Sequence, residues 1–324
     1  MRKWTRWIAA LGAATFLAAC GDDDPAVNSA GTLAEEASAR GFSALVAAAD
    51  KAGLVPALSD TASNLTVFAP TDAAFDTLAT RLGFANATAM VTALDGQTLA
   101  RILQYHVLPA RKTAADLVAG GATQATLYEF RGAPSTLALS TTSGVQLRDA
   151  VLNQASVTTA DVAASNGVIH VVDSVLVPPG VLTIVQMAQA NPTFSTLVQA
   201  VVAANLAGTL SGAGPFTVFA PTDAAFAATL SELTLTAAQL LASPDLAAIL
   251  TYHALGSAVR AADVVALPKP AAVTTLQGSS FSVDAALALT DGRNRTANLV
   301  ATDVEASNGV IHVIDNVLLP PIPH

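Results

Sequence analysis

The sequence predicts an α+β protein built from two tandem copies of one domain. Within each copy, helical apolar patterns come first and short strand-like runs follow, which is typical of the α+β class. The copies lie about 140 to 150 residues apart, so each repeat is a whole domain rather than a solenoid unit. Three segments return in the same order: Val67–Phe75 as Val218–Phe226, Tyr105–Leu108 as Tyr252–Leu255, and Ala164–Pro179 as Ala306–Pro321.

Length and composition limit the partners of the chain. Its 324 residues suffice for two domains with separate cores. The formal charge is −9, and it becomes −12 once Arg2, Lys3 and Arg6 are lost with the N-terminal segment. No basic cluster remains after that loss, so nucleic acid is not expected as a partner. Beyond residue 20, no apolar run reaches the roughly 18 residues of a membrane-spanning helix.

Residues 1–19 have the layout of a secretory signal peptide, in which a basic start precedes an apolar run of about ten residues. The segment Leu17–Cys20 resembles the bacterial lipobox, and this resemblance implies cleavage before Cys20 and attachment of lipid to its thiol. The alternative is an ordinary signal peptide that happens to contain a cysteine. Cys20 is the only cysteine, which also excludes an intrachain disulfide. Residues 20–30 contain Asp22–Asp24 and are interpreted as an acidic tether, since one short aspartate run offers too few preorganised oxygens for calcium.

Each copy is expected to begin with helices. Thr32–Ala39 and Val181–Ala190 are interpreted as the first ones. In the next helix, apolar residues at positions i, i+3, i+4 and i+7 form a stripe that must face a core. The stripe residues are Phe42, Leu45, Val46 and Ala49 in the first copy and Phe194, Leu197, Val198 and Val201 in the second.

A short strand and a capped helix follow. Leu65–Ala69 is a β-rich run closed by Pro70, and Thr71 or Asp72 is well placed to cap the next helix. A catalytic role for the aspartate is the alternative, but the strand–proline–cap–helix order favours a cap. The second copy repeats this order with Phe216–Ala220, Pro221, Thr222 and Asp223.

Two helices are expected to end at Tyr105 and Tyr252, directly before His106 and His253. As functional groups, these histidines would be general bases or metal ligands. No nucleophile or second ligand lies at a suitable spacing, since His-x-His and His-Glu-x-x-His patterns are missing. We therefore interpret each histidine as a side chain fixed by a hydrogen bond at a helix–strand junction.

Residues 123–163 and 273–305 lose the helical periodicity. Short β-compatible runs separated by Gly, Pro and Ser predict antiparallel hairpins in both regions. These runs are Ser135–Leu139, Gly144–Leu147, Phe281–Val283 and Leu287–Leu289.

The segment that closes each copy contains Ser165, His170 and Asp173 within nine residues, which suggests a hydrolase triad as one hypothesis. We interpret Asn166 and Gly167 as a turn that leads into a strand. Side chains alternate between the faces of a strand, so His170 and Asp173 point to opposite sides and cannot form a relay. The second copy repeats the pattern with Ser307, Asn308, Gly309, His312 and Asp315.

Taken together, the motifs Phe-Ala-Pro-Thr-Asp-x-Ala-Phe, Tyr-His and Asn-Gly-x-Ile-His-x-Ile/Val-Asp-x-Val-Leu resemble the fasciclin (FAS1) domain. The resemblance implies a wedge of a β-sandwich and several helices, used in surface modules for adhesion. It also implies that some bacterial and algal members carry carotenoids or other apolar ligands, and that the family is not an enzyme class. Integrin determinants of animal members would fall on the Tyr-His segments and on an Asp-Ile pair. This chain has Asp116-Leu117 and Asp263-Val264 in place of that pair, so integrin binding is not expected of it.

These observations lead to one set of expectations. After the signal peptide (1–19) and the tether (20–30), residues 31–179 and 180–324 form two FAS1-like domains. We expect a lipid-anchored bacterial envelope protein, at the outer membrane or cell surface, that binds an extracellular protein or glycan without being an enzyme. The alternative is a carrier of a small carotenoid-like apolar ligand. The candidate binding segments are Tyr105-His106 and Tyr252-His253, and neither a metal nor a cofactor is expected.

Overall fold

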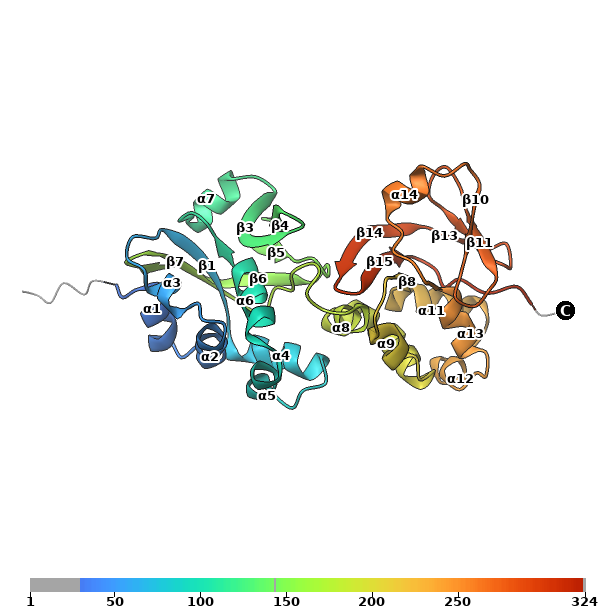
Figure 1. Ribbon diagram of the computed structural model, residues 1–324, viewed down its shortest axis with the longest axis horizontal. Helices are drawn as coiled ribbons and strands as arrows, with labels where there is room; N and C mark the ends of the chain where they lie inside the picture. The colour runs from blue at the N-terminus through green and yellow to red at the C-terminus, as the bar shows by residue number, and fades with distance from the viewer. Residues whose placement is uncertain (1–29, 143, 323–324) are drawn as a thin grey trace, which may run out of the picture.

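Two lobes, one for each copy of the repeat, lie end to end along the long axis of the molecule (Figure 1). The computed structural model describes residues 30–142 and 144–322. The signal peptide, Cys20 and nearly all of the tether therefore lie outside the described residues. The described chain begins beside α1 at one end of the long axis and finishes at the opposite end (Figure 1). The predicted arrangement of two tandem α+β domains is confirmed.

In the first domain, helices and strands are arranged as the sequence patterns predict, with most helices before the hairpins. Its helices are α1 (Leu33–Ala39), α2 (Ser43–Lys51), α3 (Val55–Ser59), α4 (Asp72–Arg81), α5 (Ala87–Ala93), α6 (Gly96–Tyr105) and α7 (Ala114–Ala119). Its strands are β1 (Leu65–Pro70), β2 (Val107–Leu108), β3 (Thr123–Phe130), β4 (Ala133–Ser140), β5 (Gln146–Arg148), β6 (Gln154–Ala164) and β7 (Gly167–Val172).

The second domain repeats this order, with η1 as an additional helical turn and with shorter strands in the hairpin region. Its helices are α8 (Ile184–Ala190), the 3-10 helix η1 (Pro192–Phe194), α9 (Ser195–Ala203), α10 (Ala207–Ser211), α11 (Asp223–Glu232), α12 (Ala237–Leu241), α13 (Leu246–Tyr252) and α14 (Ala261–Val265). Its strands are β8 (Phe216–Pro221), β9 (Ala254–Leu255), β10 (Ala271–Thr274), β11 (Ser280–Val283), β12 (Leu289–Thr290), β13 (Thr296–Ala297), β14 (Leu299–Ala306) and β15 (Gly309–Ile314).

The antiparallel hairpins predicted for both domains are present, and two of the three sheets of the described residues also contain a parallel pair that the sequence patterns did not predict. In the first domain the strand order is β2-β1-β7-β6-β5-β4-β3, and β1 pairs in parallel with β7, with Leu65 opposite Gly167. The second domain repeats the parallel pair with β8 and β15. The first strand of each domain follows the initial helices and inserts beside the last strand of the same domain, with which it runs in parallel.

The core has three clusters of buried apolar side chains. The largest lies between the helices and the sheets and continues from the first domain into the second. It contains Phe42, Leu45 and Ala49 of the stripe on α2, as the helical spacing predicts. A smaller cluster fills the hairpin side of each domain, with Tyr105 in the first and Tyr252 in the second.

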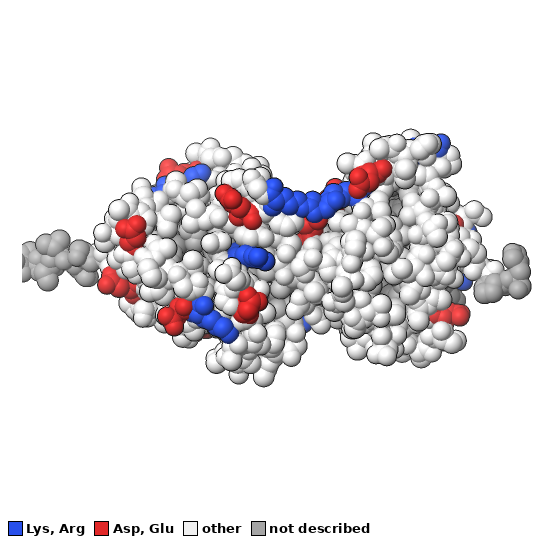
Figure 2. All heavy atoms as spheres, viewed as in Figure 1, with Lys and Arg blue, Asp and Glu red and all other residues white. Residues whose placement is uncertain are grey.

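The two domains contact one another directly. Arg81 Nη1 donates to the Ala190 carbonyl (3.1 Å), and the Asn191 Nδ2 donates to the Val151 carbonyl (2.6 Å). The Glu305 carboxylate accepts from Arg131 Nη2 and Arg260 Nε, each at 2.9 Å. Figure 2 shows charged side chains bridging the waist between the lobes on this otherwise mostly uncharged face. The short connection after Pro179 therefore joins domains that are also tied by polar contacts.

Candidate functional site

The turn before β7 is held by one amide side chain. Asn166 is buried, its Oδ1 accepts from the Leu33 N–H at the start of α1 (2.8 Å), and its Nδ2 donates to the carbonyls of Leu58 and Asp60 (2.9 Å each). Three of its four hydrogen-bonding positions are therefore used inside the domain. Gly167 follows it because a Cβ there would have no room. We assign this pair to the assembly of the helices on the sheet.

The second domain repeats the arrangement. Asn308 Oδ1 accepts from the Ile184 N–H, and its Nδ2 donates to the carbonyls of Leu210 and Gly212, all at 2.9 Å. A Cβ on Gly309 would lie 2.1 Å from the Phe216 carbonyl oxygen. The recurrence of the same three bonds in both copies supports a structural role for the turn.

The first Tyr-His segment is buried inside its domain. His106 Nε2 accepts from the Leu176 N–H (2.9 Å), so the proton lies on Nδ1, which donates to the Ile102 carbonyl (2.8 Å). The Tyr105 hydroxyl donates to the Thr136 carbonyl (3.1 Å). Both residues are about 1% exposed, so a macromolecular partner has no access to them. The hypothesis of a surface binding segment at Tyr105-His106 is therefore corrected.

Tyr252 and His253 are equally buried, at 0% and 2% exposure, and the same correction applies. His253 joins the Ile249 carbonyl (2.8 Å) to the Leu318 N–H (2.9 Å). Burial lowers the pKa of both His106 and His253 to about 4, although the hydrogen bond to the carbonyl of the preceding turn partly opposes it. Both imidazoles are therefore neutral at pH 7.

The histidine of the closing strand joins three parts of the first domain. His170 is buried, its Nδ1 accepts from the Asp161 N–H (3.3 Å), and its Nε2 donates to the Lys112 carbonyl (2.9 Å). Its ring lies 5.7 Å from that of Phe68. His312 repeats these contacts with Asp303, Val259 and Phe219.

The structure does not bring a triad together. His170 is buried on the side of Phe68, whereas Ser165 and Asp173 are exposed. Asp173 Oδ1 accepts from the Ser156 N–H (2.8 Å), a backbone group of the neighbouring strand. Asp315 makes the equivalent bond to the Asn298 N–H in the second domain (2.7 Å).

The threonine of the Pro-Thr-Asp motif caps the helix that follows it. Thr71 accepts from the Ala74 N–H (3.2 Å) at the start of α4. Asp72 has a different partner, because its Oδ1 accepts from the Ala44 N–H (2.9 Å) and its Oδ2 from the Ser43 hydroxyl, both at the start of α2. The aspartate therefore caps a neighbouring helix rather than its own.

The second copy of the motif divides these tasks in the same way. Thr222 accepts from the Ala225 N–H (3.2 Å) at the start of α11. Asp223 accepts from the Ser195 hydroxyl and the Thr196 N–H, both at 2.7 Å, at the start of α9.

Sequence reasoning missed a buried aspartate in each domain. Asp149 accepts from the N–H groups of Val151 (3.1 Å), Asn153 (2.8 Å) and Val177 (2.9 Å). Burial raises the pKa of Asp149 to about 7, and these donors partly oppose that rise. A single aspartate in a loop has no recognisable spacing, so only its repetition as Asp291 in the second copy could have indicated it.

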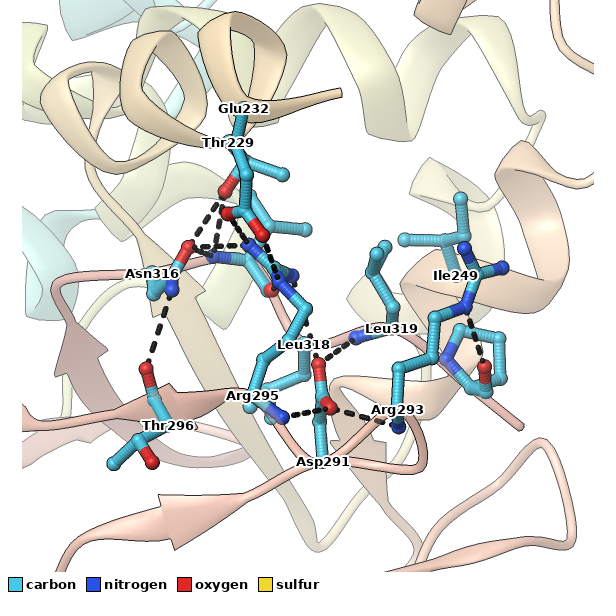
Figure 3. Close-up of polar contacts among 12 residues, drawn as sticks. Thr229, Glu232, Ile249, Asp291, Arg293, Arg295, Thr296, Asn316, Leu318 and Leu319 are labelled. Carbon is cyan, nitrogen blue, oxygen red and sulfur yellow. Dashed lines mark hydrogen bonds and ion pairs between the residues drawn. The ribbon is translucent and has the colours of Figure 1, made fainter. Parts of the chain in front are cut away.

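At the equivalent position of the second domain, Asp291 belongs to a larger polar network (Figure 3). Asp291 accepts from the N–H groups of Arg293 (2.8 Å), Arg295 (2.9 Å) and Leu319 (2.9 Å). The Arg295 guanidinium lies 3.6 Å from Asp291 and also pairs with Glu232 of α11 (2.6 Å). The network ties the last segment of the chain to a helix.

The first domain contains a cavity of about 310 Å³ among α1, α2, α3 and the sheet, here called the α1–α3 cavity. Its lining is almost wholly apolar and includes Leu33, Ala37, Leu45, Leu54 and Leu58, with His106 at the inner wall. A volume near 300 Å³ is at the lower end of the range for ligand pockets.

The equivalent cavity of the second domain is only about 30 Å³. Val185 and Val201 line it at the positions of Ala34 and Ala49, which line the first. The second domain has larger side chains at these two positions, whereas Ala207 and Ala254 are smaller than their counterparts Val55 and Val107, which line the first cavity.

No group of three or more His, Cys, Asp or Glu side chains able to hold a metal ion occurs in residues 30–142 and 144–322. Within the same residues, none of the helices combines the length and the apolar character needed to cross a bilayer. The described part of the chain consists of two tandem α+β domains whose motif residues hold the fold, with an apolar cavity in the first.

The family model of the fasciclin domain matches residues 40–178 and 192–320. The chain therefore belongs to the fasciclin domain family. This chain is similar to a solved FAS1 domain pair from the insect cell adhesion molecule fasciclin I. The likeness covers 88% of this chain and 98% of that one, with 22% sequence identity and a TM-score of 0.44.

Three relatives illustrate the range of the family. Protein sll1483 of Synechocystis sp. is 46% identical over 44% of this chain and 75% of its own length. The cell surface glycolipoprotein MPB83 of Mycobacterium bovis is 38% identical over 41% of this chain and 59% of its own. The transforming growth factor-beta-induced protein ig-h3 of Sus scrofa is 29% identical over 79% of this chain, which spans only 35% of that protein.

Proposed function

We propose that the chain is a lipid-anchored, non-enzymatic adhesion protein of the bacterial cell envelope that binds a protein or glycan outside the cytoplasm. The observation that carries the proposal is that two fasciclin domains stand end to end while their polar motif residues are engaged inside the fold. Such a molecule presents surfaces rather than a reaction centre. The likeness to a cell surface glycolipoprotein supports a place at the surface.

The direction of the chain supports the same proposal. A lipid on Cys20 would hold the chain at the end where α1 lies, because the described chain begins there (Figure 1). The second domain would then point away from the membrane. A partner outside the envelope would meet this domain first.

Exposure on intact cells tests the proposal. We expect added protease or antibody to reach the protein on intact cells, and a Cys20→Ser variant to leave the membrane fraction, since it lacks the acylated thiol. The measurement is immunoblotting of shaved cells and of membrane and soluble fractions. Protection that disappears only when the outer envelope is opened would exclude adhesion between cells.

The α1–α3 cavity supports carriage of an apolar ligand as a second candidate function. Its lining offers almost no polar groups, so it would select a molecule without hydrogen-bonding atoms in the buried part. At about 310 Å³ the cavity suits one narrow chain, such as an acyl or isoprenoid chain, rather than a bulky ring system.

Filling the cavity tests this second candidate. We expect an Ala34→Val/Ala49→Val variant, which copies the second domain, to lose most of any apolar molecule that copurifies with the unmodified protein. The measurement is the absorbance spectrum and mass spectrum of an organic extract of each purified protein. The reverse pair, Val185→Ala/Val201→Ala, serves as the matched variant and should gain ligand. Equal ligand content in all three proteins would contradict the carrier function.

A further inference from the structure

The second domain has a cleft of about 610 Å³ bordered by α11, α12, α13 and residues 317–321, here called the α11–α13 cleft. These helices lie in the lobe farther from α1 (Figure 1). The helical layer is shorter here than in the first domain, because α13 has seven residues where α6 has ten. The residues at the positions of the first turn of α6 are Ser243, Pro244 and Asp245, which line the cleft without forming a helix.

A lysine that ties the helices together in the first domain is also missing. Lys51 Nζ donates to the carbonyls of Val91 (3.0 Å) and Thr92 (2.6 Å) and so holds the end of α5 against α2. Ala203 takes the place of Lys51 at the end of α9 and has no such donor. The second domain therefore lacks the equivalent hydrogen bonds between α9 and α12.

The floor of the cleft is apolar. It is lined by leucines of α11 and α12 and the loop between them, by Ile249 of α13, and by Leu319, Pro320 and Pro321. Among the described residues, Phe226 is the only aromatic side chain in the lining, and at 3% exposure its ring is not available for stacking on a sugar. This lining favours aliphatic side chains over a glycan.

Hydrogen-bond donors surround this floor. Arg293 Nε donates to the Pro320 carbonyl (3.2 Å), and within the described residues its terminal nitrogens have neither an acceptor nor an ion-pair partner. Figure 3 shows this guanidinium extending beside Ile249. Gln239 and Gln277 use their carbonyl oxygens for backbone N–H groups (2.8 and 3.0 Å), which leaves their amide N–H groups available. Asp245 supplies the one carboxylate of the lining.

We propose that the α11–α13 cleft binds a short aliphatic peptide segment of a partner protein, with a carboxylate of that segment on Arg293. The donors complement the carbonyls and carboxylate of a peptide, and the leucines complement its side chains. The proposal rests on the adhesion function above and assigns it a protein partner. It also places the contact on the domain that a lipid anchor would hold outermost.

Two small peptides test this site on the mature full-length chain. N-acetyl-leucyl-leucine has a free carboxylate, and its C-terminal amide does not. We expect millimolar binding of the acid by NMR titration, with chemical-shift changes confined to the cleft. Arg293→Gln should weaken binding of the acid about tenfold, to the level of the amide, because one charge-assisted hydrogen bond is lost. Arg101→Gln, which removes an exposed arginine of α6, should change nothing.

Two substitutions at neighbouring residues of α13 test the cleft without changing the charge of Arg293. Ala248 lines the cleft and Ala247 is exposed beside it, so Ala248→Phe should abolish binding whereas Ala247→Phe should not. No binding of either peptide, equal binding of acid and amide, or insensitivity to both Arg293→Gln and Ala248→Phe would overturn the cleft assignment. If cells carrying Ala248→Phe still adhere normally, adhesion stands and the partner uses another surface.

Discussion

Replacing Gly167 with alanine is expected to destabilise the first domain strongly. The new Cβ would lie 2.2 Å from the Leu65 carbonyl oxygen and 3.0 Å from a methyl group of Leu33. Leu65 is the residue opposite Gly167 in the parallel pair of β1 and β7, so relief would require these strands to separate. We expect a loss of at least about 3 kcal/mol in the free energy of unfolding of this domain, measured by urea denaturation of the mature chain.

Gly208→Ala is the matched control for this prediction. Gly208 lies in α10 and has an ordinary helical backbone, and a Cβ added to it would meet no neighbouring atom within 4 Å. Alanine is favoured over glycine within helices, so this variant should be neutral or slightly more stable, by up to about 1 kcal/mol. Equal stability of the Gly167→Ala variant and the unmodified protein would show that the two strands can move apart without cost.

Acid is expected to destabilise the second domain more than the first. The pKa of His253 falls from its ordinary 6.5 to about 4 on folding, so its stabilising contribution is present above pH 6.5 and is lost as the pH falls to 4. The full loss is about 3 kcal/mol. Hydrogen exchange of β15 and β7, corrected for the intrinsic effect of pH, measures the two domains separately.

In the first domain an opposing group reduces this effect. His106 behaves like His253, but the pKa of Asp149 rises on folding from 3.8 to about 7, so its contribution is fully present below pH 3.8 and is lost as the pH rises through 7. Between pH 6.5 and 4 the two groups change stability in opposite directions. Asp149→Asn should therefore make the first domain as acid-sensitive as the second. A parallel loss in both domains of the unmodified protein would mean that Asp149 remains charged in the folded state.

Local patterns were sufficient for the general order of the elements and for the family of the chain, but the short helices α5, α7, α12 and α14 were not predicted. The apolar stripe of α2 and the strand–cap–helix order can each be recognised within about ten residues, and the repeat by comparing the two halves of the chain. The pairing of β1 with β7 could not be predicted, because alternation along a strand shows its faces but not its neighbours. The partner of Asp72 was missed for the same reason, since α2 lies well before it in the sequence and only the tertiary fold brings the two together.

Binding features were harder to predict than structural ones. The Tyr-His segments were candidates for surface contacts because the resemblance places binding determinants of animal members there, yet the structure buries both segments. The α1–α3 cavity is lined by small side chains such as Ala34 and Ala49, which do not stand out in an alanine-rich sequence. The α11–α13 cleft lies beside a helix of seven residues whose counterpart has ten. Such differences in volume leave no periodic signal.

The unequal cavities of the two domains show what a duplicated domain permits. In a single domain, the same core side chains border every interior space, so a substitution that changes the volume of one space also affects the others. With two copies, the first domain has an apolar cavity of about 310 Å³ while the equivalent space in the second is about 30 Å³, and the second domain has the α11–α13 cleft of about 610 Å³. A change of side-chain size in one copy can therefore alter the interior space of that copy and leave the space in the other copy as it is.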